Sequence, residues 1–436
     1  MRLTILGGGG FRVPLIHREL LHRPRLGVTE LVLADPDPER LAVIGRIATS
    51  TDRLRVRLTD SLPDAVRGAD FVFSAVRVGG AAGRAADERR AVAAGVLGQE
   101  TVGAAGLCYA LRTVPTAVRI ARTVAELAPD AWLVNFTNPA GLITEACRSV
   151  LGDRVIGICD SPSGLVQRIC RALDRPIAEV TYDYLGINHL GWLRSLTAGP
   201  DDLLGALLAD DERLRSFEEG RLFGAPLLRQ LAAVPNEYLY FYYRTREVLA
   251  VQQAGPTRGE LLAGEQEAFY AEASSRPASA AELWEQARLR REESYLAEAR
   301  TDQRDDADLV GGGYQRVALD LMHALSGGPA RQLILNVPNG GVTGQLPADL
   351  VIETRCTVDA SGARPGPAAP LTLHQLGLVG AVRAAERTIV TAARTGSYDA
   401  AVAGFAMHPL VASEQVGRQL VDALLASVPA LLTGTD

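Results

Sequence analysis

The stretch "RLTILGGGG", residues 2–10, decides the fold, because a short apolar strand runs directly into four glycines. "VPLIHRELLHR" (13–23) follows with apolar residues at helical spacing, and "TELVLADPDPERLAVIGRIA" (29–48) gives a second strand, a turn and a second helix. Two more apolar strands, "ADFVFSAV" (69–76) and "AWLVNFTNP" (131–139), continue the alternation. Strands that alternate with helices favour a parallel sheet covered on both faces. The sequence therefore predicts an α/β fold that begins with a Rossmann-like, doubly wound parallel sheet.

The glycine loop is suited to a dinucleotide. Gly8, Gly9 and Gly10, followed by Phe11, let the backbone approach a pyrophosphate, and the next helix presents free N–H groups and the positive end of its dipole. Asp35 ends the second strand, where an acid binds the ribose hydroxyls of NAD and disfavours the 2′-phosphate of NADP. We therefore expect NAD as cofactor. A tight turn without a ligand, with Asp35 as a turn or capping residue, is the alternative interpretation.

Length and composition describe a globular chain with a large core. The 436 residues allow two or three domains, and 47% of them are hydrophobic. From residue 170 onward the alternation weakens, so we expect residues 1–170 to form the NAD-binding domain. Residues 171–436 would then form a mixed α/β substrate-binding domain, with a cleft shared between the two.

Charge and residue usage exclude several classes of function. The net charge is −6, which gives no footprint for nucleic acid or an anionic membrane, and no run approaches the roughly 18 apolar residues of a membrane span. All 45 basic residues are arginine. A lysine-dependent P-loop or Schiff-base mechanism is therefore excluded, and an anionic ligand must be held by arginine, backbone N–H groups or helix ends.

The five cysteines are irregularly spaced and include no C-x-x-C pair. An odd number in this pattern argues against a disulfide framework. The N-terminus enters a short strand and a glycine loop without a long apolar segment, so we expect no signal peptide. A cytoplasmic location is the resulting prediction.

Polar residues follow two of the expected strands. "GICDSP" (157–162) places Cys159 and Asp160 after one strand, and "NFTNPAG" (135–141) places Asn138 after another. Because ligands collect outside the carboxyl ends of strands in open α/β sheets, we expect both segments to face one crevice. The asparagines are suited to sugar hydroxyls, or alternatively close turns before Pro139.

A thiol and an imidazole form a candidate metal pair. Cys159 and His189, in "GINHLGW", are 30 residues apart, and two such ligands would leave coordination positions open for substrate. A buried cysteine and a hydrogen-bonded structural histidine are the alternatives. Tyr238 begins the aromatic segment "YLYFYY", which indicates either packing or a tyrosine base. Arg258, in "PTRGE", is a candidate for binding an anion or for a surface salt bridge.

The order of the motifs resembles that of glycoside hydrolase family 4, the NAD- and metal-dependent glycosidases. The resemblance covers nearly the whole chain and rests on "ILGGGGF", "GRAADE", "GQETVGAAG", "NFTNPAG", "GICDSP", "GINHLGW", "PNEYLYFYY", "PTRGE", "NVPNGG" and "HPL". It implies a redox-assisted elimination rather than the usual two-carboxylate hydrolysis. NAD⁺ takes a hydride from the sugar 3-position, a base removes the proton at the 2-position, the aglycone leaves, water adds and NADH returns the hydride.

The resemblance also implies roles for individual residues. Cys159 and His189 match the metal ligands, with Mn²⁺ as the usual ion, and Tyr238 matches the base, with Tyr240 and Tyr242 as alternatives. Asp160 matches a position from which an acid could protonate the leaving oxygen. The positions that match cofactor contacts are Gly8, Gly9, Gly10, Phe11 and Asp35, and those that match substrate contacts are Arg84, Asn138, Asn188 and Arg258.

The resemblance implies a phosphorylated disaccharide or glucoside as substrate and a homodimer or homotetramer as the assembly. "PNEYLYFYY" and "NVPNGG" are more similar to the 6-phospho-β-glucosidases, which we favour, whereas the Cys-Asp pair is similar to phospho-α-glucosidases. A phospho-α-glucosidase or α-galactosidase of the same family therefore stays open. A 2-hydroxyacid NAD dehydrogenase and a non-catalytic NAD sensor are the alternatives outside this chemistry.

The rest of the chain gives only local predictions. The charged segment 273–306 predicts an exposed helix between mobile connections, and the Pro/Gly-rich segment 362–372 predicts a turn or hairpin tip. Residues 378–396 and 416–432 have the periodicity of helices.

Overall fold

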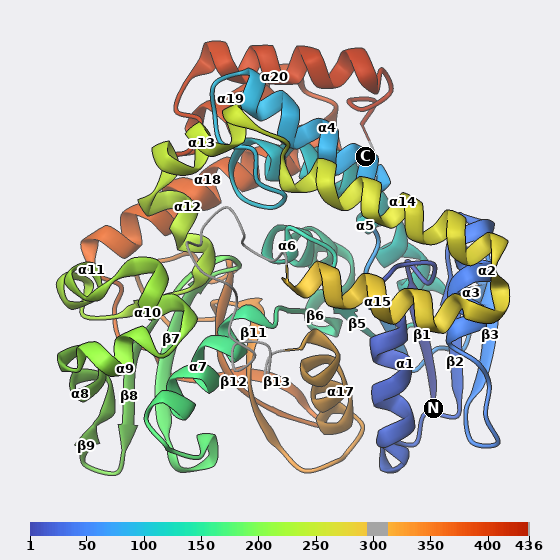
Figure 1. The fold of residues 1–436 in the computed structure, drawn as a ribbon, viewed down its shortest axis with the longest axis horizontal. Helices are drawn as coiled ribbons and strands as arrows, with labels where there is room; N and C mark the ends of the chain where they lie inside the picture. Colours follow the sequence, from blue (N-terminus) through green and yellow to red (C-terminus); the bar gives the residue numbers. More distant parts are fainter. Residues whose placement is uncertain (294–312, 435–436) are drawn as a thin grey trace.

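The first half of the chain forms the predicted doubly wound sheet. The computed structural model describes residues 1–293 and 313–434. Its first six strands pair in parallel in the order β3-β2-β1-β4-β5-β6, and helices connect them (Figure 1). The strands are β1 (Arg2–Leu6), β2 (Glu30–Ala34), β3 (Arg55–Thr59), β4 (Phe71–Ser74), β5 (Trp132–Asn135) and β6 (Val155–Ile158). The helices are α1 (Val13–His22), α2 (Pro38–Ile47), α3 (Leu62–Val66), α4 (Gly80–Ala93), α5 (Gly103–Leu127), α6 (Ala140–Leu151) and α7 (Ser161–Ala172). The α/β prediction for this half is confirmed.

The second half extends the same sheet with antiparallel strands. The strand β11 pairs with β6, and the sheet continues through β12, β7 and β8 to β10. These strands are β7 (Thr181–Ile187), β8 (Leu190–Ala198), β9 (Asp201–Asp202), β10 (Val234–Pro235), β11 (Arg331–Pro338), β12 (Val351–Asp359) and β13 (Gly362–Pro365). The mixed α/β character expected here is confirmed, while the division at residue 170 stays a prediction.

Helices of the second half cover both faces of the sheet. They are α8 (Leu203–Ala209), α9 (Asp211–Arg215), α10 (Glu218–Phe223), α11 (Ala225–Leu231), α12 (Tyr240–Tyr243), α13 (Thr245–Ala254), α14 (Arg258–Ser275), α15 (Ala280–Glu293), α17 (Tyr314–Leu325), α18 (Leu373–Thr395), α19 (Tyr398–Met407) and α20 (Glu414–Ser427). Five short 3₁₀ turns accompany them in the described residues: η1 (Pro24–Leu26), η2 (Gly152–Arg154), η3 (Ile177–Glu179), η4 (Glu237–Leu239) and η5 (Pro277–Ser279). None of the helices that the structure describes is long and apolar enough to cross a membrane.

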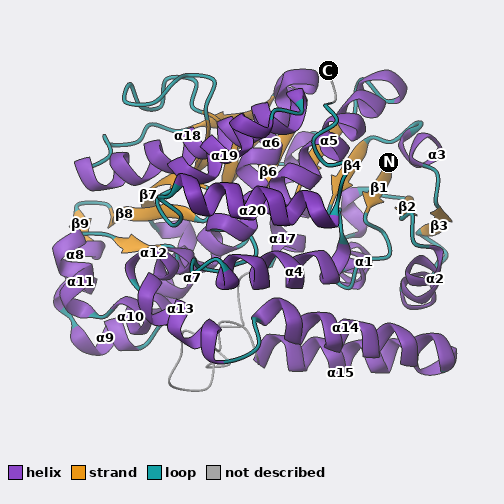
Figure 2. Cartoon of the chain, turned by 90° about the horizontal axis from the view of Figure 1, so that it is seen from above, coloured by secondary structure: helices purple, strands orange, loops and turns teal. Residues whose placement is uncertain are grey.

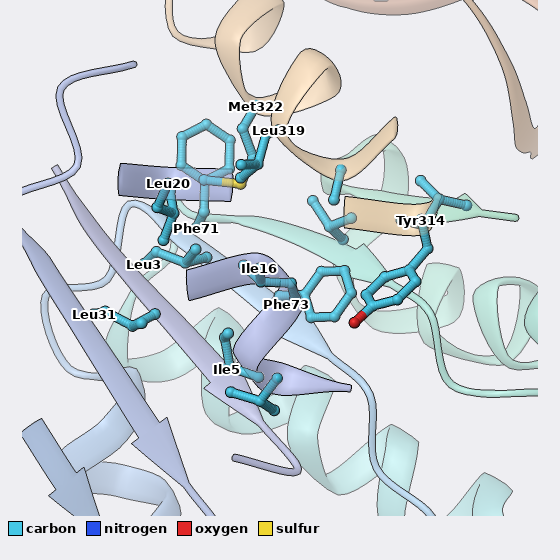
Figure 3. Close-up of a cluster of buried hydrophobic side chains, with 14 of the residues drawn as sticks. Leu3, Ile5, Ile16, Leu20, Leu31, Phe71, Phe73, Tyr314, Leu319 and Met322 are labelled. Carbon is cyan, nitrogen blue, oxygen red and sulfur yellow. The ribbon is translucent and has the colours of Figure 1, made fainter. Parts of the chain in front are cut away.

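Alternating side chains of the parallel strands fill two cores. Leu3 and Ile5 of β1 pack with Phe73 of β4 against α1 and α17 (Figure 3), together with α2, α14 and α15. Leu6 and Val72 face the opposite side, toward α5, α6 and the C-terminal helices α18, α19 and α20. Because successive side chains of a strand point to opposite faces, both faces of this sheet are buried.

The helix pair α14–α15 lies along one side of the molecule, where its two members run next to each other (Figure 2). The helix expected within segment 273–306 is α15, which is exposed along one face, while Trp284 on the other face is fully buried in the core with α1 and α2. Residues 294–306 of that segment lie outside the described residues. The helices expected over 378–396 and 416–432 are α18 and α20, and the predicted hairpin tip contains β13, which pairs with β12.

Gly157, at the centre of the sheet, has no room for a side chain. Gly157 of β6 lies between Asn135 of β5 and Asn336 of β11, and a Cβ there would be 2.3 Å from the Oγ1 atom of Thr144. We expect Gly157→Ala to lower the free energy of unfolding by about 1–3 kcal/mol, since overpacking forces neighbours apart. Differential scanning calorimetry measures this as a lower Tm.

Gly264 of α14 is the matched control. It is exposed, and apart from its neighbours in the helix no described atom lies within 4 Å of a Cβ placed there. Gly264→Ala should raise stability by roughly 0.5–1 kcal/mol through helix propensity. An unchanged Tm in Gly157→Ala would show that the sheet can yield at this position.

Candidate functional site

A cavity of about 930 Å³ lies beyond the carboxyl ends of the central parallel strands. It is lined by the glycine loop and by the segments that follow β2, β4, β5 and β6, as expected for an open α/β sheet. Of the residues predicted from sequence, those in its wall are Gly9, Gly10, Phe11, Asp35, Arg84, Asn138, Cys159, Asp160, His189, Tyr238 and Arg258. Residues from both halves of the chain therefore share one cavity.

Asp35 holds the glycine loop from the end of β2. Its carboxylate accepts hydrogen bonds from the backbone N–H groups of Gly9 and Asp37, each at 3.0 Å. Burial raises its pKa. The N-cap of α2 is Asp37, whose carboxylate accepts from the first turn of that helix, so Asp35 is not the capping residue. Gly8 lies behind the loop, where a Cβ would be 2.5 Å from the backbone nitrogen of Ala34.

Cys159 and His189 meet in the cavity wall. The Sγ atom of Cys159 is 3.6 Å from Nε2 of His189, and both residues are 95% buried. The other imidazole nitrogen, Nδ1, is 2.8 Å from the hydroxyl of Thr101. This contact fixes the orientation of the ring, so that Nε2 faces the Cys159 thiol. Metal-binding histidines are commonly oriented in this way, by a hydrogen bond to the second ring nitrogen.

The donor set fits a divalent transition metal. Burial lowers the pKa of His189 to about 3, so its imidazole is neutral at pH 7, which a metal ligand requires. Burial raises the pKa of Cys159, and the carboxylates of Glu353 and Asp160 add to this. A bound cation would stabilise the thiolate. Two protein ligands would leave coordination positions open for substrate and water. Among residues 1–293 and 313–434, no three His, Cys, Asp or Glu side chains gather into a metal cluster.

Tyr238 lies against the imidazole. Its ring stacks on that of His189 with centroids 3.7 Å apart and an interplanar angle of 11°. Tyr240 and Tyr242 are absent from the described cavity wall and pack in neighbouring apolar clusters instead. Among the tyrosines of this segment, Tyr238 is thus the one that contacts the imidazole and lines the cavity.

Asp160 and Asn138 face the cavity, whereas Asn135 does not. Asp160 precedes α7, but its side chain makes no capping hydrogen bond to that helix. The amide of Asn135 is buried and donates to the carbonyl oxygens of Thr137 and Ala140, so it closes the turn after β5. For Asn135 the turn-closing interpretation is the one that the structure supports.

Arginines concentrate positive charge at one end of the cavity. Arg84 pairs with Glu88 at 2.7 Å and with Glu100, which also pairs with Arg77. Further arginines in the wall are Arg12, Arg258 and Arg291. Burial lowers the pKa of Arg291, as do the neighbouring guanidinium groups. Such a crowd of cations is suited to phosphate groups.

Asn188 supports the turn that carries His189. Its Oδ1 atom accepts from the backbone N–H of Ala140 at 3.1 Å, and its Nδ2 atom donates to Glu353 at 3.2 Å. It does not line the described cavity. His189 itself has a φ of +63°, so its backbone is in the left-handed region, and the bonds of Asn188 help to hold that conformation.

The structure also shows site residues that the sequence analysis did not single out. Thr101 and Glu100 lie in "GQETVGAAG", and Glu237 precedes Tyr238 in "PNEYLYFYY". Glu237 lines the cavity, and burial raises its pKa to about 7. Glu353 accepts hydrogen bonds from Tyr184, Asn188 and Asn336 under the same site. The quoted motifs contained three of these residues, but only the fold shows what they contact.

Known families and structures match this chain over almost its whole length. The model of the family 4 glycosyl hydrolases matches residues 2–175, and the model of that family's C-terminal domain matches residues 184–411. The probable 6-phospho-β-glucosidase of Bacillus subtilis is 29% identical, with 99% of this chain and 96% of that protein covered. The 6-phospho-β-glucosidase of Escherichia coli is 28% identical, with 95% and 92% covered.

A solved structure has the same architecture. The 6-phospho-β-glucosidase of Thermotoga maritima, solved with manganese, NAD⁺ and glucose 6-phosphate, superposes with a TM-score of 0.82 at 25% identity, and 98% of each chain is covered. The two family models together span both halves of the sheet and every residue of the thiol–imidazole–phenol group. By these matches the chain belongs to glycosyl hydrolase family 4.

Proposed function

We propose that this chain hydrolyses 6-phospho-β-glucosides, such as phosphorylated cellobiose or aryl glucosides, with NAD and a divalent metal. The observation that carries the proposal is the thiol–imidazole pair of Cys159 and His189, which shares one cavity with a glycine loop. Two β-glucosidase relatives and the Thermotoga maritima structure with its bound manganese, NAD⁺ and glucose 6-phosphate support it.

The residues present fit both groups. The loop Gly8–Phe11 and the carboxylate of Asp35 would hold NAD, while Cys159 and His189 would hold the metal, with Mn²⁺ as the first candidate. When bound, NAD would accept and return a hydride at the sugar 3-position, and the metal would polarise the 2- and 3-oxygens.

The side chains around the pair would move the protons. Tyr238, fixed by stacking on His189, would take the proton from the sugar 2-position and return one when water adds. Asp160, whose carboxylate is not used for capping, would protonate the leaving oxygen. Neither step needs a covalent bond between the sugar and the protein.

The charged wall would hold the substrate. Arg84 and Arg258 would bind the 6-phosphate, since a phosphate matches the fork of a guanidinium group, and Asn138 would contact a sugar hydroxyl. Asn188 would support the site through the turn that carries His189, and a direct contact with the substrate stays a prediction. The cytoplasmic location, the homodimer or homotetramer and the division of the cleft between residues 1–170 and 171–436 also stay predictions.

A phospho-α-glucosidase activity is the second candidate. The Cys159–Asp160 pair favours it, and the phospho-α-glucosidase of Clostridium acetobutylicum is 24% identical over 97% of this chain. Elimination passes through a flat intermediate, so the geometry of the metal pair does not by itself select an anomer.

A substrate panel tests the proposal. We expect turnover of 6-phospho-β-glucosides that requires NAD⁺, Mn²⁺ and reduced thiol, and much slower turnover of the α anomers, galactosides and unphosphorylated sugars. Release of the aglycone measures it, with dialysed, chelated enzyme as the control. Full activity without cofactor and metal would contradict the mechanism, and net NADH formation from 2-hydroxyacids without glycosidase turnover would favour a dehydrogenase.

The thiol can be tested apart from catalysis. We expect Cys159→Ser to raise the Kd for Mn²⁺ by more than the ~10- to 100-fold that loss of an outer partner costs, because a hydroxyl that stays neutral replaces an anionic thiolate ligand. Isothermal titration calorimetry should show the NAD Kd unchanged. Cys147→Ser, buried between α5 and α6 outside the cavity wall, is the control, and wild-type Mn²⁺ affinity in Cys159→Ser would reduce Cys159 to packing.

The phenol has matched controls in its own segment. We expect Tyr238→Phe to lower kcat/KM by about 10²- to 10⁴-fold, the usual contribution of a general base. It should also slow the exchange of the substrate 2-proton with D₂O, followed by NMR. Tyr240→Phe and Tyr242→Phe should stay near the wild-type value, and a larger loss in either variant would move the base to that residue.

A further inference from the structure

Three carbonyl groups of the glycine loop accept hydrogen bonds from aromatic side chains far along the chain. The Tyr270 hydroxyl donates to the carbonyl of Gly9 at 2.6 Å, and the Trp284 indole Nε1–H donates to that of Phe11 at 2.7 Å. The Tyr314 hydroxyl donates to the carbonyl of Arg12. The sequence separations are 261, 273 and 302 residues, so α14, α15 and the start of α17 each contribute one donor.

These bonds lie in an apolar layer. Trp284 is 0% exposed, and Tyr270 and Tyr314 are 8% and 3% exposed. The Phe11 ring meets Phe269 edge-on at 5.3 Å and lies 6.0 Å from Trp284. A carbonyl covered by such a layer needs a donor, because a buried unpaired acceptor is costly. The three aromatic side chains are thus both the cover of the loop and its hydrogen-bond partners.

The bonds fix the direction of the loop's peptide groups. A peptide unit is planar, so a carbonyl held by a donor also fixes the N–H on the opposite side of the same plane. Trp284 in this way sets the N–H of Arg12, and Tyr270 sets that of Gly10, which closes the loop onto the carbonyl of Gly7 at 2.9 Å. A bonded carbonyl also polarises its own N–H and strengthens it as a donor.

We infer that Tyr270, Trp284 and Tyr314 are positioning residues for the dinucleotide. They hold the carbonyl dipoles of Gly9, Phe11 and Arg12 in one orientation, and the N–H groups of Gly10 and Val13 close the loop on itself, so that a pyrophosphate meets a backbone already fixed ahead of α1. The inference rests on the proposed use of NAD. It assigns the second half of the chain a role in binding the cofactor.

Trp284 gives the sharpest test, since its single N–H is already used and its side chain is fully buried. We expect Trp284→Phe to raise the NAD Kd about three- to tenfold, the value of one lost hydrogen bond, in calorimetry on the full chain without metal. ADP-ribose should weaken by the same factor, because it carries the same pyrophosphate.

Trp192→Phe is the matched control. Trp192 is also fully buried, and its indole donates one hydrogen bond, to the Tyr243 hydroxyl, outside the cavity wall. Both variants should lower the Tm to a similar extent, but only Trp284→Phe should change the NAD Kd. Equal NAD Kd values in the two variants would overturn the inference.

The phenols give an independent second measurement. Tyr270→Phe and Tyr314→Phe should each weaken NAD about three- to tenfold, and the double variant by roughly the product. Tyr398→Phe, which loses a hydrogen bond to Asp422 between α19 and α20, should leave NAD affinity unchanged. Wild-type NAD affinity in both Tyr270→Phe and Tyr314→Phe would overturn this inference but leave the proposed function intact. If the wild-type chain binds no NAD, the inference and the proposed function are both overturned.

Discussion

The imidazole of His189 is the point on which the site depends. Its Nδ1 atom is held by Thr101, which precedes α5, and its Nε2 atom faces Cys159 at the end of β6. Tyr238 stacks on its face from η4. Three segments that are far apart in sequence thus orient one ring, and the left-handed turn that carries the ring is itself tied to Ala140 and Glu353 through Asn188. If this ring moved, the Cys159 thiol and the Tyr238 phenol would no longer be held in a fixed position relative to each other and to the cavity.

The parallel half of the fold could be predicted from sequence because its signals are local. Strand periodicity, the glycine loop and the polar residues after β5 and β6 all lie within short windows, and the crevice follows from the rule for open sheets. The pairing of β11 with β6 could not be predicted, since the register of Leu335 with Ile158 joins residues separated by most of the second half. No periodicity reports a contact of that kind.

The site residues also divide into those that local motifs predict and those that only the fold shows. Cys159, His189 and Tyr238 stood in recognisable motifs, and the structure brings them together. Glu237 and Glu353 were missed because their importance comes from burial, which raises the pKa of each to about 7. The charged neighbours of Trp284 in sequence predict an exposed helix, but this helix turns Trp284 into the core together with Ala280 and Ala287.

The continuous sheet has a consequence for how ligands reach the cavity. Two domains joined by a linker can open by a hinge motion, but here β6 and β11 are neighbouring strands of one sheet, paired at Gly157 and Asn336. Opening at that seam would expose buried backbone groups, at about 1–3 kcal/mol for each group left unpaired. An opening that admits a ligand and keeps this ladder intact would therefore have to involve the helices and loops above the strand ends.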